Sequence, residues 1–215
     1  MERFTRRRFV QDGTALAAAC GLALISGCTT RAEQAGGTHS QSRATVPGRK
    51  KDPVFRPLQE ADRVTLARPA KQVIDKADQL GRDLMKQHGG CSRCTIAAMQ
   101  QSLGFLPADA DLLRAASVLD GGATPSGVQN CGAFTGAGMV IGYACGPEGF
   151  TRSDLARRLF REVYSRFENA YGSVLCKDIK PKAVGGCSAV VGLAARWTAQ
   201  SLLGRFAGYE EDERA

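Results

Sequence analysis

The chain has 215 residues, of which 43% are hydrophobic and 23% are charged. This length suits one domain with extensions better than two full domains, and the composition excludes a wholly disordered chain. Lysine and arginine number 29 against 21 aspartates and glutamates, but four basic residues fall within the first eight positions and the predicted folded region has no dense basic run. We therefore predict no nucleic-acid partner. The unusual quantity is cysteine, with eight in a chain that has two histidines.

Residues 1–28 have the parts of an export signal. A basic patch, Thr-Arg-Arg-Arg-Phe-Val at 5–10, precedes an uncharged apolar segment at 15–27, which is the order found in secretory signals. The pattern around the arginines resembles a twin-arginine signal. An ordinary secretory signal with a chance arginine pair is the alternative.

The stretch Ile-Ser-Gly-Cys at 25–28 resembles a bacterial lipobox. Cleavage before Cys28 would leave a lipidated N-terminus, and its acyl chains would exceed the roughly two signals that stable membrane attachment needs. We therefore expect an exported protein on the periplasmic side of the membrane, in contact with it through a lipid anchor on Cys28. Cleavage to a soluble form and an uncleaved signal used as an anchor are the alternatives.

The rest of the chain divides into a linker and a helical domain. Residues 29–57 are rich in Thr, Gly, Ser, Gln, Arg and Pro, without apolar periodicity, and are predicted to be a flexible linker. Residues 58–215 are predicted to form an all-α domain, a compact bundle of five or six short to medium helices. The predicted helices cover 69–88, 91–103, 109–119, 131–143, 151–171 and 187–203.

The segment 151–171 gives the clearest helical pattern. Its apolar residues fall on one stripe: Leu155, Leu159, Phe160, Val163, Tyr164 and Phe167. Thr151 and Asp154 have the spacing of a capping box, with Asp in place of Glu, so Thr151 is the predicted N-cap. We expect the domain core to include Phe160, Val163, Phe167 and Trp197.

Six cysteines of the domain lie at or near predicted helix ends: Cys91, Cys94, Cys131, Cys145, Cys176 and Cys187. The partial positive charge at a helix N-terminus favours a thiolate, which is the form that binds metals and attacks disulfides. Buried structural cysteines would more often lie within apolar helix faces. The placement therefore favours chemistry over packing.

The stretch Cys-Gly-Ala-Phe-Thr-Gly at 131–136 follows a cysteine on a helix and precedes two more cysteines. This order resembles a bacterial family of redox-active proteins named for its pattern C, GCAxxG, C, C. The resemblance covers about residues 70–205. It makes the four pattern cysteines Cys94, Cys131, Cys176 and Cys187.

The resemblance implies a redox-active protein in which these four cysteines are metal ligands, with an iron–sulfur cluster as the expected cofactor. Electron transfer with a redox partner protein is the expected role. Cys91 and Cys145 are additional to the pattern and are expected to be auxiliary thiols. They could form a disulfide with each other, or Cys91 could form a redox dithiol with Cys94.

Glycines recur at intervals of four after Cys131, beginning with Gly132 and Gly136. Because glycine within a helix costs roughly 0.5 to 1 kcal/mol relative to alanine, the repeat implies a compensating contact. One possibility is a second helix at close range. The other is a cofactor against bare backbone, which would make Gly132 and Gly136 cofactor-binding residues.

Three other chemistries can be compared with the sequence. A c-type haem needs Cys-x-x-Cys-His, and Thr95 follows Cys94, so we expect no c-type haem. A thiol–disulfide function of Cys91 and Cys94 remains possible, although without the βαβ pattern of thioredoxin. A third possibility is a non-redox binding lipoprotein whose six domain cysteines form three disulfides in an oxidising compartment.

Overall fold

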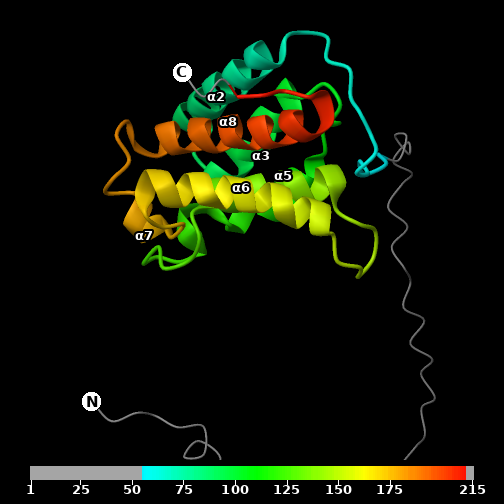
Figure 1. Ribbon diagram of the computed structural model, residues 1–215. Helices are drawn as coiled ribbons and strands as arrows, with labels where there is room; N and C mark the ends of the chain where they lie inside the picture. The colour runs from blue at the N-terminus through cyan, green and yellow to red at the C-terminus, as the bar shows by residue number, and fades with distance from the viewer. Residues whose placement is uncertain (1–54, 212–215) are drawn as a thin grey trace, which may run out of the picture. The chain divides into compact units, whose positions relative to one another are not determined.

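A computed structural model of the chain describes residues 55–211, which belong to one compact unit (Figure 1). The predicted export signal, the lipidation site Cys28 and all of the predicted linker before residue 55 lie outside the described residues. Among the helices of the described part, none is long and apolar enough to cross a membrane.

Residues 55–211 form seven α-helices and two short 3₁₀ helices, and contain no β-strand. The α-helices are α2 (Ala70–His88), α3 (Cys91–Ser102), α4 (Ala110–Ala115), α5 (Gly132–Cys145), α6 (Asp154–Tyr171), α7 (Cys176–Ile179) and α8 (Gly186–Ala207). The 3₁₀ helices are η1 (Ala116–Val118) and η2 (Asp120–Ala123). The predicted all-α class is confirmed. The count differs because the four-residue α7 is too short to give a periodic pattern.

Helix α8 lies at the centre of the bundle and packs against α2, α3, α5 and α6 (Figure 1). Most of its residues from Ala189 to Phe206 are buried, on all sides of the helix. A helix that is apolar all round is expected to be enclosed by its neighbours. Its many alanines and glycines keep it thin enough to be surrounded by four helices.

The contact between α2 and α8 combines close backbone approach with buried charge. A Cβ on Gly81 would lie 3.0 Å from the carbonyl oxygen of Val191, so the two helices nearly touch there. Beside this point the carboxylate of Asp78, on a residue only 7% exposed, accepts from Arg82 Nε at 2.5 Å and Arg196 Nε at 2.8 Å. Two guanidinium groups therefore compensate a carboxylate that burial would otherwise destabilise.

Helix α6 buries one face, as its amphipathic sequence predicts. Its buried residues are Leu155, Leu159, Val163, Phe167 and Tyr171. Tyr164, which we placed on the same stripe, is 44% exposed. Of the four expected core residues, Val163 and Phe167 are fully buried, whereas Phe160 and Trp197 are half-buried at the edge of the core.

The N-terminus of α6 corrects one prediction. The N-cap is Ser153, whose hydroxyl accepts from the backbone N–H of Ala156 at 3.0 Å. Thr151 lies two residues earlier, and its hydroxyl donates to the carbonyl of Glu148 instead. Serine and threonine are both residue types that are preferred at the N-cap position. The N-cap lies two residues later than the capping-box spacing suggested, so it is the Ser153 hydroxyl that reaches a free N–H group of the first turn.

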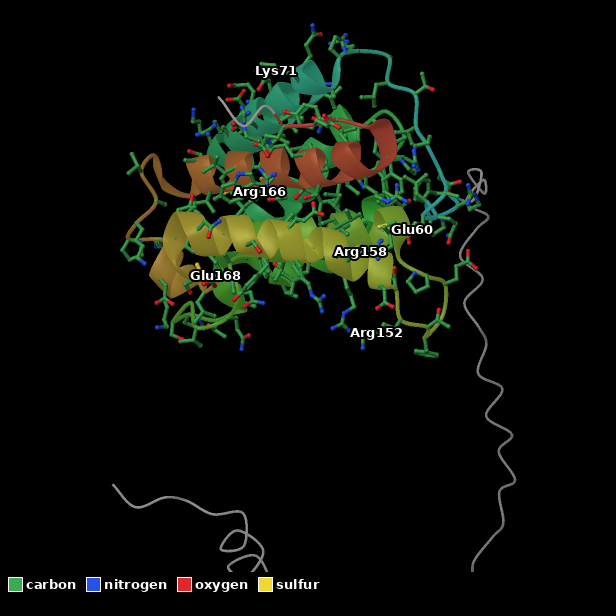
Figure 2. The ribbon with its side chains drawn as sticks, viewed as in Figure 1. Glu60, Lys71, Arg152, Arg158, Arg166 and Glu168 are labelled. Atoms are coloured by element: carbon green, nitrogen blue, oxygen red, sulfur yellow. The ribbon has the colours of Figure 1, made fainter. Side chains whose placement is uncertain are left out.

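The segment before α2 is attached to the bundle. The N–H of Leu58 donates to the carbonyl of Ala144, and the N–H of Val64 donates to that of Phe206, each at 2.8 Å. Glu60 forms an ion pair with Arg158 of α6, which lies beside it in Figure 2. The residues directly before α2 thus pack against α5, α6 and α8.

Candidate functional site

The first turn of α3 carries Cys91 and is capped from another segment. Gly90, the N-cap residue, adopts a left-handed conformation with φ of 81° and offers no side chain. Asp120 of η2 takes that role, because its Oδ1 accepts from the backbone N–H of Ser92 at 2.7 Å. Its Oδ2 lies 3.7 Å from Arg93 Nε. Asp120 therefore holds η2 against the start of α3.

Two further cysteines are brought together by a short backbone pairing. The N–H of Cys131 donates to the carbonyl of Val174 at 2.8 Å, and the N–H of Cys176 donates to the carbonyl of Gln129 at 3.1 Å. Cys131 is the N-cap residue of α5, and Cys176 is the first residue of α7. The pairing places the starts of these two helices side by side.

Glycines allow the helices that carry these cysteines to approach each other. A Cβ on Gly132 would overlap the sulfur of Cys91, and a Cβ on Gly136 would lie 2.6 Å from the carbonyl oxygen of Ser92. A Cβ on Gly122 would lie 2.8 Å from the Cβ of Cys176. Side chains at these positions would force α5 and η2 away from their neighbours.

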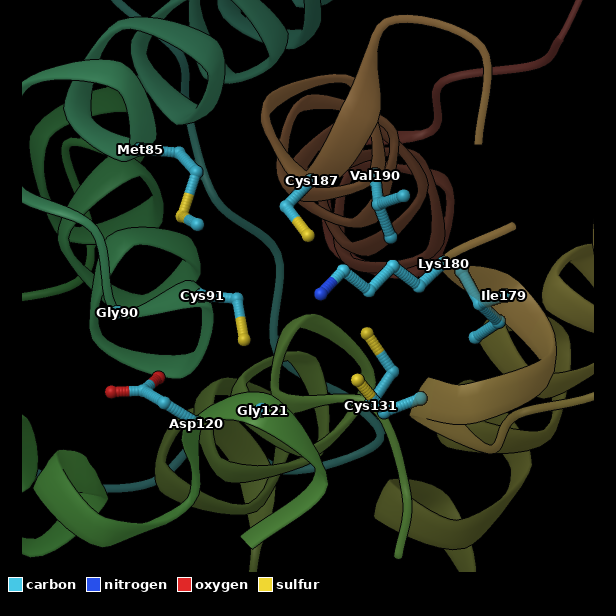
Figure 3. Close-up of a pocket in the computed structure, with 11 residues that line it drawn as sticks. Met85, Gly90, Cys91, Asp120, Gly121, Cys131, Ile179, Lys180, Cys187 and Val190 are labelled. Carbon is cyan, nitrogen blue, oxygen red and sulfur yellow. The ribbon is translucent and has the colours of Figure 1, made fainter. Parts of the chain in front are cut away.

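The four cysteines that result from this packing line one cavity of about 120 Å³, which we call the four-cysteine cavity (Figure 3): Cys91, Cys131, Cys176 and Cys187. Met85, Ile179 and Val190 supply apolar side chains to its wall. Cys91 and Cys131 are buried, Cys176 is half-buried and Cys187 is exposed. The cavity therefore has a buried end and a solvent-facing end.

Each of these cysteines lies at the start of a helix: α3, α5, α7 and α8. In the three longer helices, α3, α5 and α8, the partial positive charge of the N-terminus favours an anionic sulfur. The cysteines that the sequence places at helix ends therefore surround one cavity, and the positive ends of these helices favour thiolates there.

The two buried sulfurs form an asymmetric pair. A hydrogen bond from the Cys131 thiol lowers the pKa of Cys91 to about 7, assisted by the backbone N–H groups of Gly121 and Ser92 and opposed by burial and by the negative charge of Asp120. The same hydrogen bond, together with burial, raises the pKa of Cys131 strongly. As the pH rises through about 7, the pair therefore becomes a Cys91 thiolate that accepts a hydrogen bond from a Cys131 thiol.

Burial makes two further thiols, those of Cys176 and Cys145, less acidic. Burial raises the pKa of Cys176, and the positive charge of Lys180 partly opposes that rise. Burial also raises the pKa of Cys145 to about 11. Of the two buried thiols of the cavity, Cys91 is thus the one prepared to act as a thiolate.

A model of the family described as "Putative redox-active protein (C_GCAxxG_C_C)" matches residues 90–201, which include all four cavity cysteines. This chain belongs to the C_GCAxxG_C_C family. The resemblance seen in the sequence is confirmed, and with it the redox-active class. No curated protein and no solved structure matches the chain significantly.

The C_GCAxxG_C_C match leaves the choice of cysteines to the geometry. Of the four expected ligands, Cys131, Cys176 and Cys187 line the four-cysteine cavity and Cys94 does not. The sulfur of Cys94 donates to the carbonyl of Gly89 at 3.0 Å and lines a separate hollow. Cys91, expected to be auxiliary, is the fourth cysteine of the cavity.

Three other sequence expectations can be placed. Cys145 closes α5, where its sulfur donates to the carbonyl of Ile141 at 3.3 Å, away from the four-cysteine cavity. Gly132 and Gly136 contact α3 and do not line the cavity, so their contacts are those of close helix packing. The chain has Cys131 before Gly132, the reverse of the order written in the family name, and this order puts the residue without a Cβ against Cys91.

Two features of the site were missed in the sequence: Asp120 and Lys180. Both line the four-cysteine cavity. Asp120 directly precedes the glycine pair Gly121 and Gly122, and Lys180 follows Cys176 by four positions, about one helical turn. These two spacings were the available signals in the sequence.

The sulfurs are all free thiols in the described part of the chain, Cys91, Cys94, Cys131, Cys145, Cys176 and Cys187 alike. Within residues 55–211 no three His, Cys, Asp or Glu side chains are arranged to hold a single metal ion.

Proposed function

We propose that this protein binds an iron–sulfur cluster through Cys91, Cys131, Cys176 and Cys187 and serves in electron transfer. The observation that carries the proposal is the convergence of four cysteines, from four helix starts, on one cavity. Cysteine thiolates are the usual protein ligands of such clusters, and four are the usual number. Cys91 takes the place that the sequence had suggested for Cys94, because only Cys91 faces the other three.

The surroundings of the sulfurs fit this donor set. Met85, Ile179 and Val190 line the cavity with apolar groups, which limits water around the sulfurs. The backbone N–H groups of Ser92 and Gly121 face Cys91, and hydrogen bonds to sulfur are among the factors that set the potential of a cluster. When bound, the cluster would accept and release single electrons. The protein's own residues would hold it and shield it.

The test is anaerobic purification of the mature domain, with measurement of iron, acid-labile sulfide and the visible spectrum. The proposal expects iron and sulfide in the same molar amount and a broad visible absorption that bleaches on reduction. A colourless protein without iron or sulfide, even after reconstitution with ferrous iron and sulfide, would contradict it.

A second candidate function is thiol–disulfide exchange by Cys91 and Cys131. It is favoured by the hydrogen bond between them and by the pKa of about 7 for Cys91. The Cys91 thiolate would attack a partner's disulfide and release one partner thiolate. Cys131, after losing its proton to solvent, would then attack the Cys91 sulfur and release the second partner thiolate, so that the partner is reduced and the cysteine pair oxidised.

The sequence suggested Cys94 as the dithiol partner of Cys91, but Cys91 and Cys94 line different hollows. This arrangement favours Cys131 as the partner of Cys91. Reaction of the iron-free protein with oxidised glutathione distinguishes the two pairs. A disulfide between Cys91 and Cys131, found by peptide mass analysis, supports this second candidate. A Cys91–Cys94 disulfide, or none, contradicts it.

We further propose that the protein is exported by a twin-arginine signal, is anchored on the periplasmic side through Cys28, and exchanges electrons with a partner protein. These proposals rest on the sequence of residues 1–28. The twin-arginine route fits a protein that folds around its cofactor before export. Replacing Arg6 and Arg7 by Lys should stop export of a reporter fusion, and normal export of that variant would contradict the route.

A further inference from the structure

Lys180 is the cationic side chain of the four-cysteine cavity. It follows α7 directly, and its backbone N–H donates to the carbonyl of Cys176 at 3.0 Å. In Figure 3 its side chain extends into the space between Cys187 and Cys91, with the ammonium nitrogen directed into the cavity. The position of α7 therefore brings a positive charge to the sulfurs.

The neighbouring lysines have other partners. Lys177 forms an ion pair with Asp178 at 3.1 Å, and Lys182 donates to the carbonyl of Tyr171 at 2.5 Å. The ammonium group of Lys180 makes no hydrogen bond or ion pair with any residue between 55 and 211. Its ammonium is thus available to whatever occupies the cavity.

The carboxylate of the cavity does not neutralise this charge. Asp120 is the acidic residue in the lining, and its two oxygens are engaged by the N–H of Ser92 and by Arg93. The remaining lining residues are cysteines, glycines and apolar side chains. One uncompensated ammonium therefore faces four sulfurs.

We propose that Lys180 raises the reduction potential of the cluster held in the four-cysteine cavity by placing a positive charge beside its sulfur ligands. This inference rests on the proposed function. Four thiolate ligands give such a site an excess of negative charge, and reduction adds one electron to it. A nearby cation stabilises the more negative, reduced form more than the oxidised form, and net charge is one of the factors that set cluster potentials.

The location of Lys180 adds a second property. The residue is exposed, and Cys187 beside it is exposed as well. The charge of an exposed group is screened by salt, with a Debye length of about 10 Å at 0.1 M ionic strength. The contribution of Lys180 to the potential should therefore shrink as salt is added.

The experiment compares the midpoint potentials of the reconstituted wild-type protein, Lys180→Met and Lys177→Met. Lys177 is the matched control, because it lies on α7, which Lys180 directly follows, but its ammonium pairs with Asp178. We expect Lys180→Met to shift the equilibrium about tenfold toward the oxidised form, which is ~59 mV for a one-electron couple. Lys177→Met should stay close to the wild type, and the difference between Lys180→Met and wild type should narrow at high salt.

Lys180→Arg provides the rescue, because it keeps the positive charge on a side chain of similar length. Its potential should lie near that of the wild type. If Lys180→Met does not retain the cluster, the comparison is made between Lys180→Gln and Lys180→Arg, with the lower potential expected for Lys180→Gln.

The outcomes separate the inference from the proposed function. If the wild type takes up no iron and sulfide, the proposed cluster is wrong and the role of Lys180 is wrong with it. If the wild type holds the cluster but Lys180→Met and Lys177→Met have the same potential, only the inference is wrong. A Lys180→Arg variant that shifts as far as Lys180→Met would also overturn it, because the effect would then not follow the charge.

Discussion

Gly132 of α5 lies against the sulfur of Cys91 on α3, so closely that a Cβ on the glycine would overlap the sulfur. The glycine that follows Cys131 is therefore what allows the two buried cysteines to meet. The reversed Cys-Gly order of this chain therefore has a packing role: it removes a side chain at the point where two cysteine-bearing helices touch.

This relationship predicts that Gly132→Ala moves Cys91 away from Cys131. The added methyl group would meet both the Cys91 sulfur and the carbonyl oxygen of Leu119, which is 2.7 Å from the ideal Cβ position. We expect a loss of about 2 kcal/mol in the free energy of unfolding, within the usual cost of overpacking. Chemical denaturation measures it.

Gly142 is the matched control on the same helix, because a Cβ there would have no neighbour within 4 Å. Gly142→Ala should raise the free energy of unfolding by about 0.5 to 1 kcal/mol, since alanine is the better helix former. Equal effects of the two substitutions would show that the contact between Gly132 and Cys91 has no special role.

The asymmetric cysteine pair predicts a thiol that ionises near neutral pH in the iron-free protein. The thiolate form is gained as the pH rises through the pKa of Cys91, about 7. A titration of thiolate ultraviolet absorbance should show a step there in the wild type and not in Cys91→Ser. In Cys131→Ala the step should move to higher pH because the hydrogen bond that stabilises the thiolate is lost.

Cys94→Ser provides the control for this titration, because the Cys94 sulfur donates to a backbone carbonyl and burial is the main cause that raises its pKa. This variant should keep the step near pH 7. A step that persists in Cys91→Ser but disappears in Cys94→Ser would show that the acidic thiol is Cys94, and our assignment to Cys91 would be wrong.

The contact between α2 and α8 predicts a large effect of Asp78→Ala. The substitution leaves Arg82 and Arg196 without the carboxylate that they share. Removing one partner of a buried ion pair costs ~3 to 5 kcal/mol, and partial exposure of both guanidinium groups places the expected loss near the lower end. Thermal or chemical unfolding gives the value.

Asp75→Ala serves as the comparison, because Asp75 also pairs with Arg196, at 3.0 Å, but its side chain is 45% exposed. Exposed ion pairs contribute about 1 kcal/mol or less. If Asp75→Ala destabilises the protein as much as Asp78→Ala, burial of the carboxylate is not the reason for the effect.

The sequence was sufficient for the fold class and for most helices because the apolar periodicity of α2 and α6 is strong. It was less informative where the outcome depends on a contact between distant segments. Thr151 and Ser153 are both good capping residues, and only the position of α6 selects Ser153. Trp197 lies at the edge of the core rather than in it, because small residues fill the centre of α8.

The choice between Cys91 and Cys94 illustrates the same limit. The two residues share the first turn of α3, and their separation of three positions turns them about 60° from each other around the helix axis. Nothing local states which one faces α5. That is determined by Asp120, which caps α3, and by Gly132, which admits the Cys91 sulfur.

The central claim is that Cys91, and not Cys94, completes a common site with Cys131, Cys176 and Cys187. The most direct test measures iron and acid-labile sulfide bound by single serine variants of all six domain cysteines after identical anaerobic reconstitution. Circular dichroism of each variant confirms that the helical fold is kept. Our account predicts loss of bound iron and sulfide in Cys91→Ser, Cys131→Ser, Cys176→Ser and Cys187→Ser, and retention in Cys94→Ser and Cys145→Ser. Retention in a folded Cys91→Ser together with loss in Cys94→Ser would contradict it.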